Sequence, residues 1–429
     1  MKTLALLFSA SWLGSGWCQT FETLHYLTGA DGAEPNGPLV RGSDGCLYGA
    51  TSSGGVWGQG TIFKLTPTGQ FVSVASFNGT NGSGPSGVTF GADGNLYGTS
   101  QGSNTTWNVF RASTSGAITV LGSYNETMGA AFPELLVQAP DGVFYGTTQQ
   151  GGAYDYGVAF SVTTNGLIRV LATFDGTNGA FPGFDPAALV LRQGILYGTT
   201  YEGGSNWCGT AFSLTTNGVL TTLACFGGPQ GIGPRGTLLL ANDGSFYGVA
   251  DNHESSASIF RMTPEGVIST LCTLSGPLGG ESNPSGLIQA RDGYLYGSII
   301  LLGSNGAVYR FSGGEALDIV FQFSNTNGSD PWQLVQGADG NLYGATSLGG
   351  VDYGTVFALT FPQLNSTETS NQIVLSWPTN QTGFTLQSSA SLISPAWLNC
   401  DIAPAIVGDL FVVTNPISAP ADFFRLMRQ

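Results

Sequence analysis

Positive charge is scarce in this 429-residue sequence, which holds 12 Lys and Arg against 27 Asp and Glu and carries a formal net charge of -15. A surface that binds nucleic acid needs clustered Lys and Arg to neutralise phosphates. The composition therefore excludes nucleic acid as a partner. Charged residues make up only 9% of the chain, and an acidic, Lys-poor surface suits a soluble extracellular protein.

Long apolar runs are also lacking. No stretch beyond the first 18 residues has 18 or more consecutive apolar residues, so we expect no membrane span. Residues 1-18 predict a secretory signal, with Lys2, an apolar run from Leu4 to Leu13, and the small residues Gly16 and Cys18 before a cut ahead of Gln19. The sequence therefore predicts a secreted, extracellular protein.

Cysteines are few, and five remain after the predicted signal. None has the close spacing that zinc sites use, so the sequence predicts no metal site and no cofactor. Cys208 and Cys225 flank a predicted hairpin, and a disulfide across it is one alternative. An odd cysteine would then remain for an exported chain.

Glycine, in contrast, is abundant, and the 66 glycines mark a repeat. Seven Leu/Phe-Tyr-Gly triplets recur at spacings of 47 to 52 residues, and they carry Tyr48, Tyr97, Tyr145, Tyr197, Tyr247, Tyr296 and Tyr343. Asp-Gly precedes six of them, and Gln193-Gly194 precedes the fourth. Since Asp-Gly between apolar runs is typical of a two-residue hairpin turn, we interpret these aspartates as turn residues rather than catalysts.

Each repeat predicts four short strands, which is the pattern of a β-propeller blade. A proline precedes the first strand; the set is Pro85, Pro133, Pro186, Pro234, Pro284 and Pro331, with Pro35 slightly offset. The seventh repeat stops after its third strand at Leu359, and Phe21 to Leu27 resembles an unpaired fourth strand. We therefore predict an all-β fold in which residues 19-360 form a seven-bladed β-propeller closed by the N-terminal strand.

These motifs resemble the Gloeo-Verruco (GloVer) tandem repeat, whose hallmark is Asp-Gly-Asn-Leu-Tyr-Gly-Thr-Thr, then Gly-Gly, then Gly-Thr-Val-Phe-Lys-Leu. The likeness is carried by Asp93 to Thr99, by Asp44 to Thr51 with Gly60 to Leu65, and by Asp339 to Thr346 with Gly354 to Leu359. It implies an exported bacterial protein and assigns no activity. Proteins of this kind, including the choice-of-anchor type, often end in a sorting anchor, and this sequence shows no such hydrophobic tail.

After Phe361-Pro362 the composition shifts to Ser, Thr and Asn with alternating strands. Residues 361-429 therefore predict a small Ig-like or fibronectin-like β-sandwich. The segment resembles the terminal β-modules of secreted verrucomicrobial proteins, through Trp377-Pro378, Phe384 to Ser388 and Phe423 to Leu426.

The loops between second and third strands are long, and we expect function on the face that they share with the links between repeats. An aromatic residue recurs in these loops; the set is Trp57, Trp107, Tyr156, Trp207 and Tyr353. Aromatic faces stack on sugar rings, so these residues are candidates for glycan binding. The alternative is that each packs against a neighbouring repeat.

The fifth loop departs from the repeat with Asp251-Asn252-His253-Glu254. Asp251, His253 and Glu254 form the one trio suited to proton transfer or metal ligation, although a solvated polar loop is the alternative. Our leading hypothesis is a non-enzymatic protein that recognises a polysaccharide or a cell-surface component. One alternative is a polysaccharide lyase or hydrolase that uses the same face, for which the sequence offers only the His253 loop and isolated residues such as Arg235 and Glu202. The other is a structural or adhesive surface protein.

Overall fold

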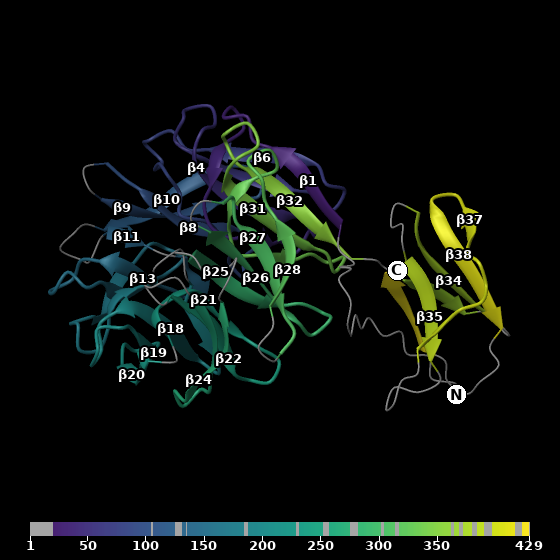
Figure 1. Ribbon diagram of the computed structural model, residues 1–429. Coiled ribbons are helices and arrows are strands. Elements are labelled where there is room, and N and C mark those ends of the chain that lie inside the picture. Colours follow the sequence, from purple (N-terminus) through teal and green to yellow (C-terminus); the bar gives the residue numbers. More distant parts are fainter. Residues whose placement is uncertain are drawn as a thin grey trace. The chain divides into compact units, whose positions relative to one another are not determined.

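The computed structural model describes residues 20-103, 106-124, 131-133, 135-183, 188-228, 231-251, 257-274, 282-301, 304-313, 317-361, 364-368, 372-379, 384-389, 397-416 and 423-428. Every regular element of these residues is a β-strand, which confirms the all-β fold class (Figure 1). Across the same ranges there is no helix of the length and apolarity that crossing a membrane requires. Two compact units are present, Thr23–Ala358 and a second one that contains the residues from Leu359 onward.

Among the described residues of the larger unit the strands form seven sheets, one from each repeat. The first sheet consists of β2 (Ala33–Pro35), β3 (Val40–Arg41), β4 (Leu47–Ser53), β5 (Thr61–Leu65) and β6 (Phe71–Ser76). The second consists of β7 (Thr89–Phe90), β8 (Leu96–Gln101), β9 (Trp107–Ala112) and β10 (Ile118–Tyr124). The third consists of β11 (Ala131–Pro133), β12 (Val137–Gln138), β13 (Phe144–Gln150), β14 (Val158–Val162) and β15 (Ile168–Thr173).

The fourth sheet consists of β16 (Ala180–Pro182), β17 (Val190–Arg192), β18 (Ile195–Glu202), β19 (Thr210–Thr215) and β20 (Leu220–Cys225). The fifth consists of β21 (Ile232–Leu240), β22 (Phe246–Asp251), β23 (Ala257–Met262) and β24 (Ile268–Leu274). The sixth consists of β25 (Ser282–Gln289), β26 (Leu295–Leu301), β27 (Ala307–Phe311) and β28 (Leu317–Gln322). The seventh consists of β29 (Ser329–Pro331), β30 (Val335–Gln336), β31 (Leu342–Leu348), β32 (Thr355–Thr360) and β1 (Thr20–Tyr26).

The first strand position of a sheet is often split into two short strands around the repeat proline, as in β2 and β3. Pro35 pairs with Thr51, which lies three residues after the repeat tyrosine of its sheet. Pro182 pairs with Thr200, which lies three residues after the repeat tyrosine of the fourth sheet. Pro35 is therefore not offset from the other prolines. In the fourth sheet the repeat position belongs to Pro182, so the assignment of Pro186, which lies outside the described residues, was wrong.

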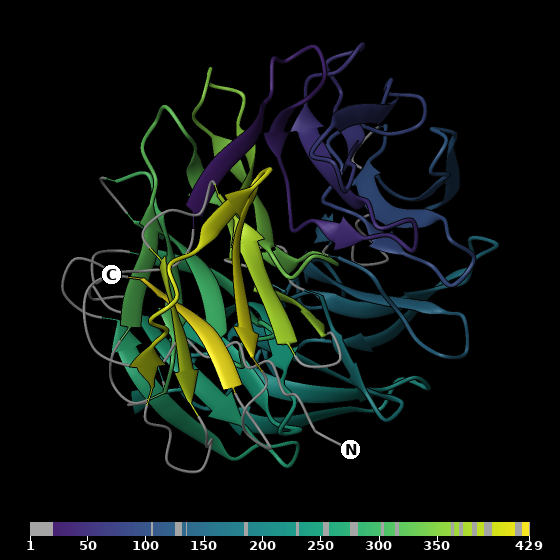
Figure 2. The ribbon, with the colours of Figure 1, turned by 90° about the vertical axis from the view of Figure 1, so that its right-hand side faces the viewer.

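The seventh sheet meets the first. Strand β2 contacts β31, the Trp332 indole Nε1 donates to the Pro35 carbonyl at 2.6 Å, and the Glu34 amide donates to the Tyr353 carbonyl at 2.9 Å. Strand β1 pairs with β32, as the sequence predicted. In Figure 2 the sheets of this unit follow one another in chain order, and the light green of the seventh lies beside the purple of the first.

Most of the hydrophobic core of this unit lies between successive sheets. One cluster joins Tyr48 and Phe77 of the first sheet to Leu96 and Phe110 of the second, and further clusters follow around the unit. Another cluster joins Leu27 and Val356 to residues of the first sheet, among them Phe63. Each sheet thus depends on its neighbour to bury its apolar side chains.

The repeat aspartate and tyrosine form a brace in each turn that has both residues. The tyrosine hydroxyl donates to the aspartate Oδ2 at 2.7 to 3.1 Å in six sheets. In the second sheet Asp93 Oδ1 also accepts the backbone amide of Asn95, which holds the turn. Burial acts to raise the pKa of Asp93, but hydrogen bonds from Asn95 and Tyr97 outweigh it and leave that pKa lowered. The aspartates thus serve the turns, as the sequence analysis interpreted them.

Replacing Tyr97 by Phe removes one brace and leaves the ring in place. Burial, followed by the bond to Asp93, raises the pKa of Tyr97 to about 12, so the lost group is a neutral donor to a carboxylate. We expect Tyr97→Phe to lower the free energy of unfolding by about 2 kcal/mol, measured by urea denaturation. The matched control is Tyr197→Phe, because Gln193 replaces the aspartate there, and its loss should stay below about 1 kcal/mol. Equal losses of unfolding free energy in Tyr97→Phe and Tyr197→Phe would show that the bond to the Asp93 carboxylate does not stabilise the fold.

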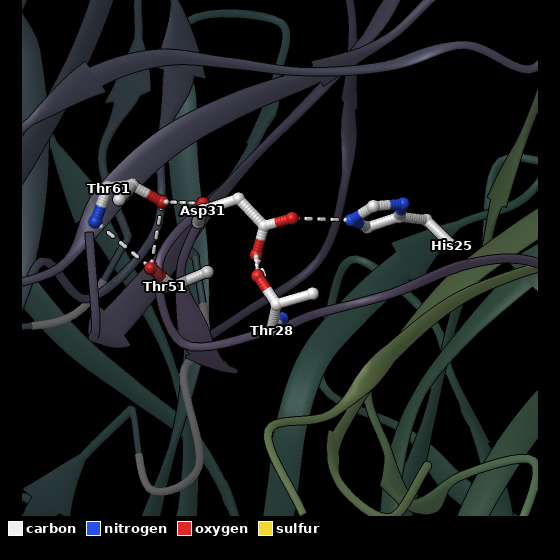
Figure 3. A network of polar contacts seen from close by, with 5 residues as sticks. All are labelled: His25, Thr28, Asp31, Thr51 and Thr61. Carbon is white, nitrogen blue, oxygen red and sulfur yellow. Dashed lines mark hydrogen bonds and ion pairs between the residues drawn. The ribbon is translucent and has the colours of Figure 1, made fainter. Parts of the chain in front are cut away.

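A polar network ties the closing strand β1 to the first sheet (Figure 3). His25 Nε2 lies 2.8 Å from Asp31 Oδ2, while Asp31 Oδ1 accepts hydrogen bonds from the Thr28 amide and hydroxyl at 2.9 Å. The Thr61 hydroxyl donates to the Asp31 carbonyl, and the His25 ring stacks on Phe71 with centroids 3.9 Å apart. The network therefore links a strand of the seventh sheet to strands β5 and β6.

Asp31→Asn tests this network with little disturbance, because Asn178 and Asn327 occupy the matching place in two other sheets, where each accepts the same kind of amide bond. Burial acts to raise the pKa of Asp31, but bonds from Thr28 and His25 outweigh it and lower that pKa. The carboxylate therefore stabilises the fold above its unfolded pKa of about 3.9, and this contribution is lost as the pH falls through the folded pKa. We expect urea unfolding to show a loss of about 1 kcal/mol at pH 7 that becomes steadily smaller as the pH is lowered below about 4. A loss that does not depend on pH would contradict this account.

The second unit has two sheets that share one core. One consists of β33 (Asn365–Glu368), β34 (Gln372–Pro378), β38 (Leu410–Pro416) and β37 (Ala405–Val407), and the other of β36 (Leu398–Asn399), β35 (Phe384–Ser389) and β39 (Phe423–Arg428). Trp377 is fully buried and packs with Leu375 and Val413 from the first of these sheets and with Leu386 and Phe424 from the other.

Candidate functional site

The long-loop face of the larger unit consists of the loops between second and third strands together with the links between sheets. Hydrogen bonds join each kind of segment to the other. The Gly55 amide donates to the Gly29 carbonyl, the Gly204 amide to the Gly176 carbonyl and the Gly350 amide to the Asn325 carbonyl. The two kinds of connection therefore lie together, as strands that alternate in direction require.

The five predicted aromatic residues do not form one group. Trp57, Trp207 and Tyr353 lie in loops and are 63%, 53% and 43% exposed. Tyr156 is half-buried, and its ring centroid lies 5.7 Å from that of Trp207. Within the ranges that the structure describes, no ring contact joins Trp57 or Tyr353 to another of the five.

Trp107 was placed wrongly in a loop by its spacing. It is the first residue of strand β9 and packs, half-buried, against the core cluster that contains Tyr97 and Tyr124. The reason is that the loop of the second sheet is short, running only from Gly102 to Thr106, so the aromatic position falls inside the next strand. Trp107 therefore packs in the structure, which was the alternative to glycan binding.

Of the predicted polar trio, only Asp251 can be placed. His253 and Glu254 lie outside the described residues. Asp251 ends strand β22, where it pairs with Ile232 of β21. Its carboxylate Oδ2 lies 3.3 Å from Nη2 of Arg235. Arg235, like Ile232, is a residue of β21.

Arg235 also reaches across to the fourth sheet. Its Nη2 donates to the Tyr201 hydroxyl at 3.3 Å, and its Cζ lies 4.8 Å from the centre of the Tyr201 ring. We call Tyr201, Arg235 and Asp251 the Arg235 cluster. The side chains of Arg235 and Asp251 are only 9% and 15% exposed, so this charge pair is largely shielded from water.

Gly233 makes room for the cluster. It has a φ of 58°, and a Cβ on it would lie 2.6 Å from Cε2 of Tyr201. Only glycine tolerates both the left-handed backbone and the ring above it. The Tyr201 ring is therefore held against the first strand of the fifth sheet.

The chemistry of the Arg235 cluster follows from its charges. Burial raises the pKa of Tyr201, and although Arg235 acts to lower it, the net direction is upward. The phenol thus stays protonated at neutral pH and can donate a proton. Arg235 offers guanidinium donors in the planar arrangement that matches a carboxylate or another anion.

Tyr201 was missed by sequence reasoning, whereas Arg235 and Asp251 were both named. The available signal was Tyr201, which stands four residues after the repeat tyrosine, where the first, second and third sheets have Ser or Gln. The contact between Tyr201 and Arg235 joins two repeats, so no local pattern contains it.

Within the described residues no group of three His, Cys, Asp or Glu side chains is arranged to hold a metal ion. No disulfide joins cysteines of the described ranges, so the alternative of a Cys208–Cys225 disulfide is not observed. Cys208 is half-buried and donates to the Asn206 carbonyl at 3.2 Å.

The chain belongs to the Gloeobacter/Verrucomicrobia repeat family. The family model matches residues 15–188 and 101–305, which together cover about two thirds of the sequence. This confirms the resemblance to the GloVer repeat. No curated protein matches the sequence.

Solved structures show a distant likeness. A putative 6-phosphogluconolactonase from Bacteroides fragilis is 16% identical, with a TM-score of 0.48 and coverage of 92% of this chain and 98% of that one. A gluconolactonase from Xanthomonas campestris is 14% identical, with a TM-score of 0.44 and coverage of 80% and 90%. The PQQ-bound aldose sugar dehydrogenase from Streptomyces coelicolor is 15% identical, with a TM-score of 0.43 and coverage of 67% and 96%.

These similar structures carry the names of enzymes, and this finding contradicts the leading hypothesis of a non-enzymatic polysaccharide-recognising protein. It agrees better with the enzyme alternative. At these identities and TM-scores, however, the likeness assigns no activity or substrate to this chain.

Proposed function

We propose that this protein is a lyase that cleaves a polysaccharide containing uronic acid residues, with the Arg235 cluster as its active site. The observation that carries the proposal is the position of one Arg235 guanidinium group within 3.3 Å of both the Tyr201 hydroxyl and the Asp251 carboxylate. A lyase needs an anion-binding group, a base and a proton donor, and these three side chains supply one of each.

The reaction is a β-elimination. Arg235 binds the substrate carboxylate and stabilises the negative charge that develops when the neighbouring C5 proton leaves. Asp251 accepts that proton, and the bond between C4 and the glycosidic oxygen breaks as a C4–C5 double bond forms. Tyr201 donates its proton to the departing oxygen. Substrate enters from the long-loop face.

The architecture belongs to the same proposal. The seven sheets form a closed seven-bladed propeller of residues 19-360, supported by the contact of β2 with β31. Residues 361-429 form an Ig-like or fibronectin-like sandwich of the kind found at the end of secreted verrucomicrobial proteins, supported by the shared core around Trp377. Residues 1-18 direct secretion, which would bring the enzyme to extracellular polysaccharides.

Purified protein with and without cluster substitutions tests the active site. We expect the wild type to release unsaturated sugars from uronate polymers, followed by ultraviolet absorbance. Tyr201→Phe should lower kcat about 100-fold or more, since it keeps the ring over Arg235 and removes only the proton donor. Tyr154→Phe is the matched control, because Tyr154 lies exposed in a loop of the same face, and it should leave kcat unchanged.

Two outcomes would refute this proposal. One is a wild-type protein that acts on no uronate polymer. The other is a Tyr201→Phe protein of unchanged melting temperature and full activity. Release of reducing ends from neutral polysaccharides without unsaturated products would instead favour hydrolysis.

The pH profile gives a separate test of the role of Tyr201. A general acid must be protonated, and burial raises the pKa of Tyr201 above the usual value of about 10. We therefore expect kcat to persist as the pH rises to about 9 and to fall only at higher pH. A fall in kcat between pH 7 and 8, without unfolding, would assign the proton donor to another group.

A further inference from the structure

A cavity opens on the opposite face of the larger unit, where the short turns lie. It has a volume of about 350 Å³ and lies where the fifth and sixth sheets adjoin. The residues that line it include Tyr247, Gln289, Asp292, Tyr294 and Phe311. We call it the sixth-sheet cavity. Its volume is at the small end of the range for ligand sites, which suits a single ring rather than a chain.

The third-to-fourth turn of the sixth sheet explains why there is space here. In the first sheet the matching turn carries Pro67, whose ring lies beside the turn glycine Gly45. A Cβ built on Gly45 would be 3.5 Å from this ring. In the fourth sheet Thr216 reaches Tyr145 of the preceding sheet. The sixth sheet has Gly313 instead, with a φ of 91° and no atom within 4 Å of where its Cβ would be.

Tyr294 is a second departure from the repeat. The same position carries Asn95 in the second sheet and Asn341 in the seventh, where each amide bonds to the turn aspartate. In the sixth sheet the Arg310 Cζ lies 4.4 Å from the centre of the Tyr294 ring, and Arg310 also pairs with Asp318 at 3.5 Å. The ring is therefore held in one orientation at the cavity wall.

Asp292 is the one acidic residue among the described residues that line the cavity. No Lys or Arg is among the described residues that line it. Burial raises the pKa of Asp292 even though Tyr296 and the Tyr294 amide donate to it, whereas hydrogen bonds lower the pKa of the matching Asp44 and Asp93. Both carboxylate oxygens of Asp292 already accept hydrogen bonds, from the Tyr294 amide and the Tyr296 hydroxyl, so the described lining offers a charged ligand no ready partner.

We infer that the sixth-sheet cavity binds a neutral monosaccharide or a similar polyhydroxylated ring. Aromatic rings such as those of Tyr247 and Tyr294 stack on the carbon face of sugars, and Ser312 and the glycine backbone of Gly313 in the same lining can bond to hydroxyl groups. This site lies on the face opposite the Arg235 cluster, uses none of its residues and does not depend on the proposed lyase activity.

Saturation-transfer NMR on the full chain tests this site with D-glucose and D-xylose as neutral probes and with glucuronate and glucosamine as charged probes. We expect binding of a neutral sugar that is at least about tenfold weaker in Tyr294→Asn, which installs the residue of the second and seventh sheets. The matched control is Tyr154→Asn, the same change at an exposed loop residue, which should bind as the wild type does.

Melting temperature and circular dichroism show whether the Tyr294→Asn protein folds. If it does not fold, Tyr294→Phe is measured in its place. This variant keeps the ring, so it should retain neutral sugar binding. Absence of binding by both neutral probes to the wild type, unchanged affinity in a folded Tyr294→Asn protein, or preference for a charged sugar would overturn the inference. Tyr201→Phe should leave binding at this site unchanged, which separates it from the lyase proposal.

Discussion

The contacts between the seventh and first sheets are the constraint on which the larger unit depends. Each sheet buries apolar side chains against the next, so an open row would leave the outer faces of the first and last sheets in water. Trp332 bonding to Pro35, and Leu27 packing near Phe63, remove those exposed faces. The unit thereby becomes a scaffold on which side chains from different repeats meet at fixed distances.

Within this scaffold, residues shared by the repeats and residues that depart from them have different roles. A buried pair of threonine hydroxyls recurs at 2.8 to 2.9 Å, as Thr51 with Thr61 and Thr200 with Thr210, and it fixes the second and third strands beside the link. The Asp–Tyr brace fixes the opposite end of the second strand. Tyr201, Arg235 and Tyr294 depart from the repeat, and both candidate sites contain such residues.

The sequence predicted features that depend on short segments. Asp-Gly turns specify hairpins through local backbone geometry, so the strands and the β1 partner of β32 followed from the repeat. Positions assigned by counting residues from the repeat tyrosine were wrong in two places. Trp107 was misplaced because the connection before it is shorter, and Pro186 was chosen in place of Pro182 because two prolines lie close together. The Tyr201–Arg235 contact joins residues of different sheets, and neither residue's neighbours in the chain indicate it.

The position of the Arg235 cluster on strands bears on its chemistry. Tyr201, Arg235 and Asp251 lie on β18, β21 and β22, so backbone hydrogen bonds and the close contact with Gly233 hold them before any substrate binds. Loop residues such as Trp57 and Tyr353 are exposed and share no ring contact with the other predicted aromatics in the described ranges. Groups that act together in one reaction must keep their separations to a fraction of an ångström, and strands meet this requirement better than long loops. The strand-borne cluster is therefore the better candidate for catalysis than the aromatic loops.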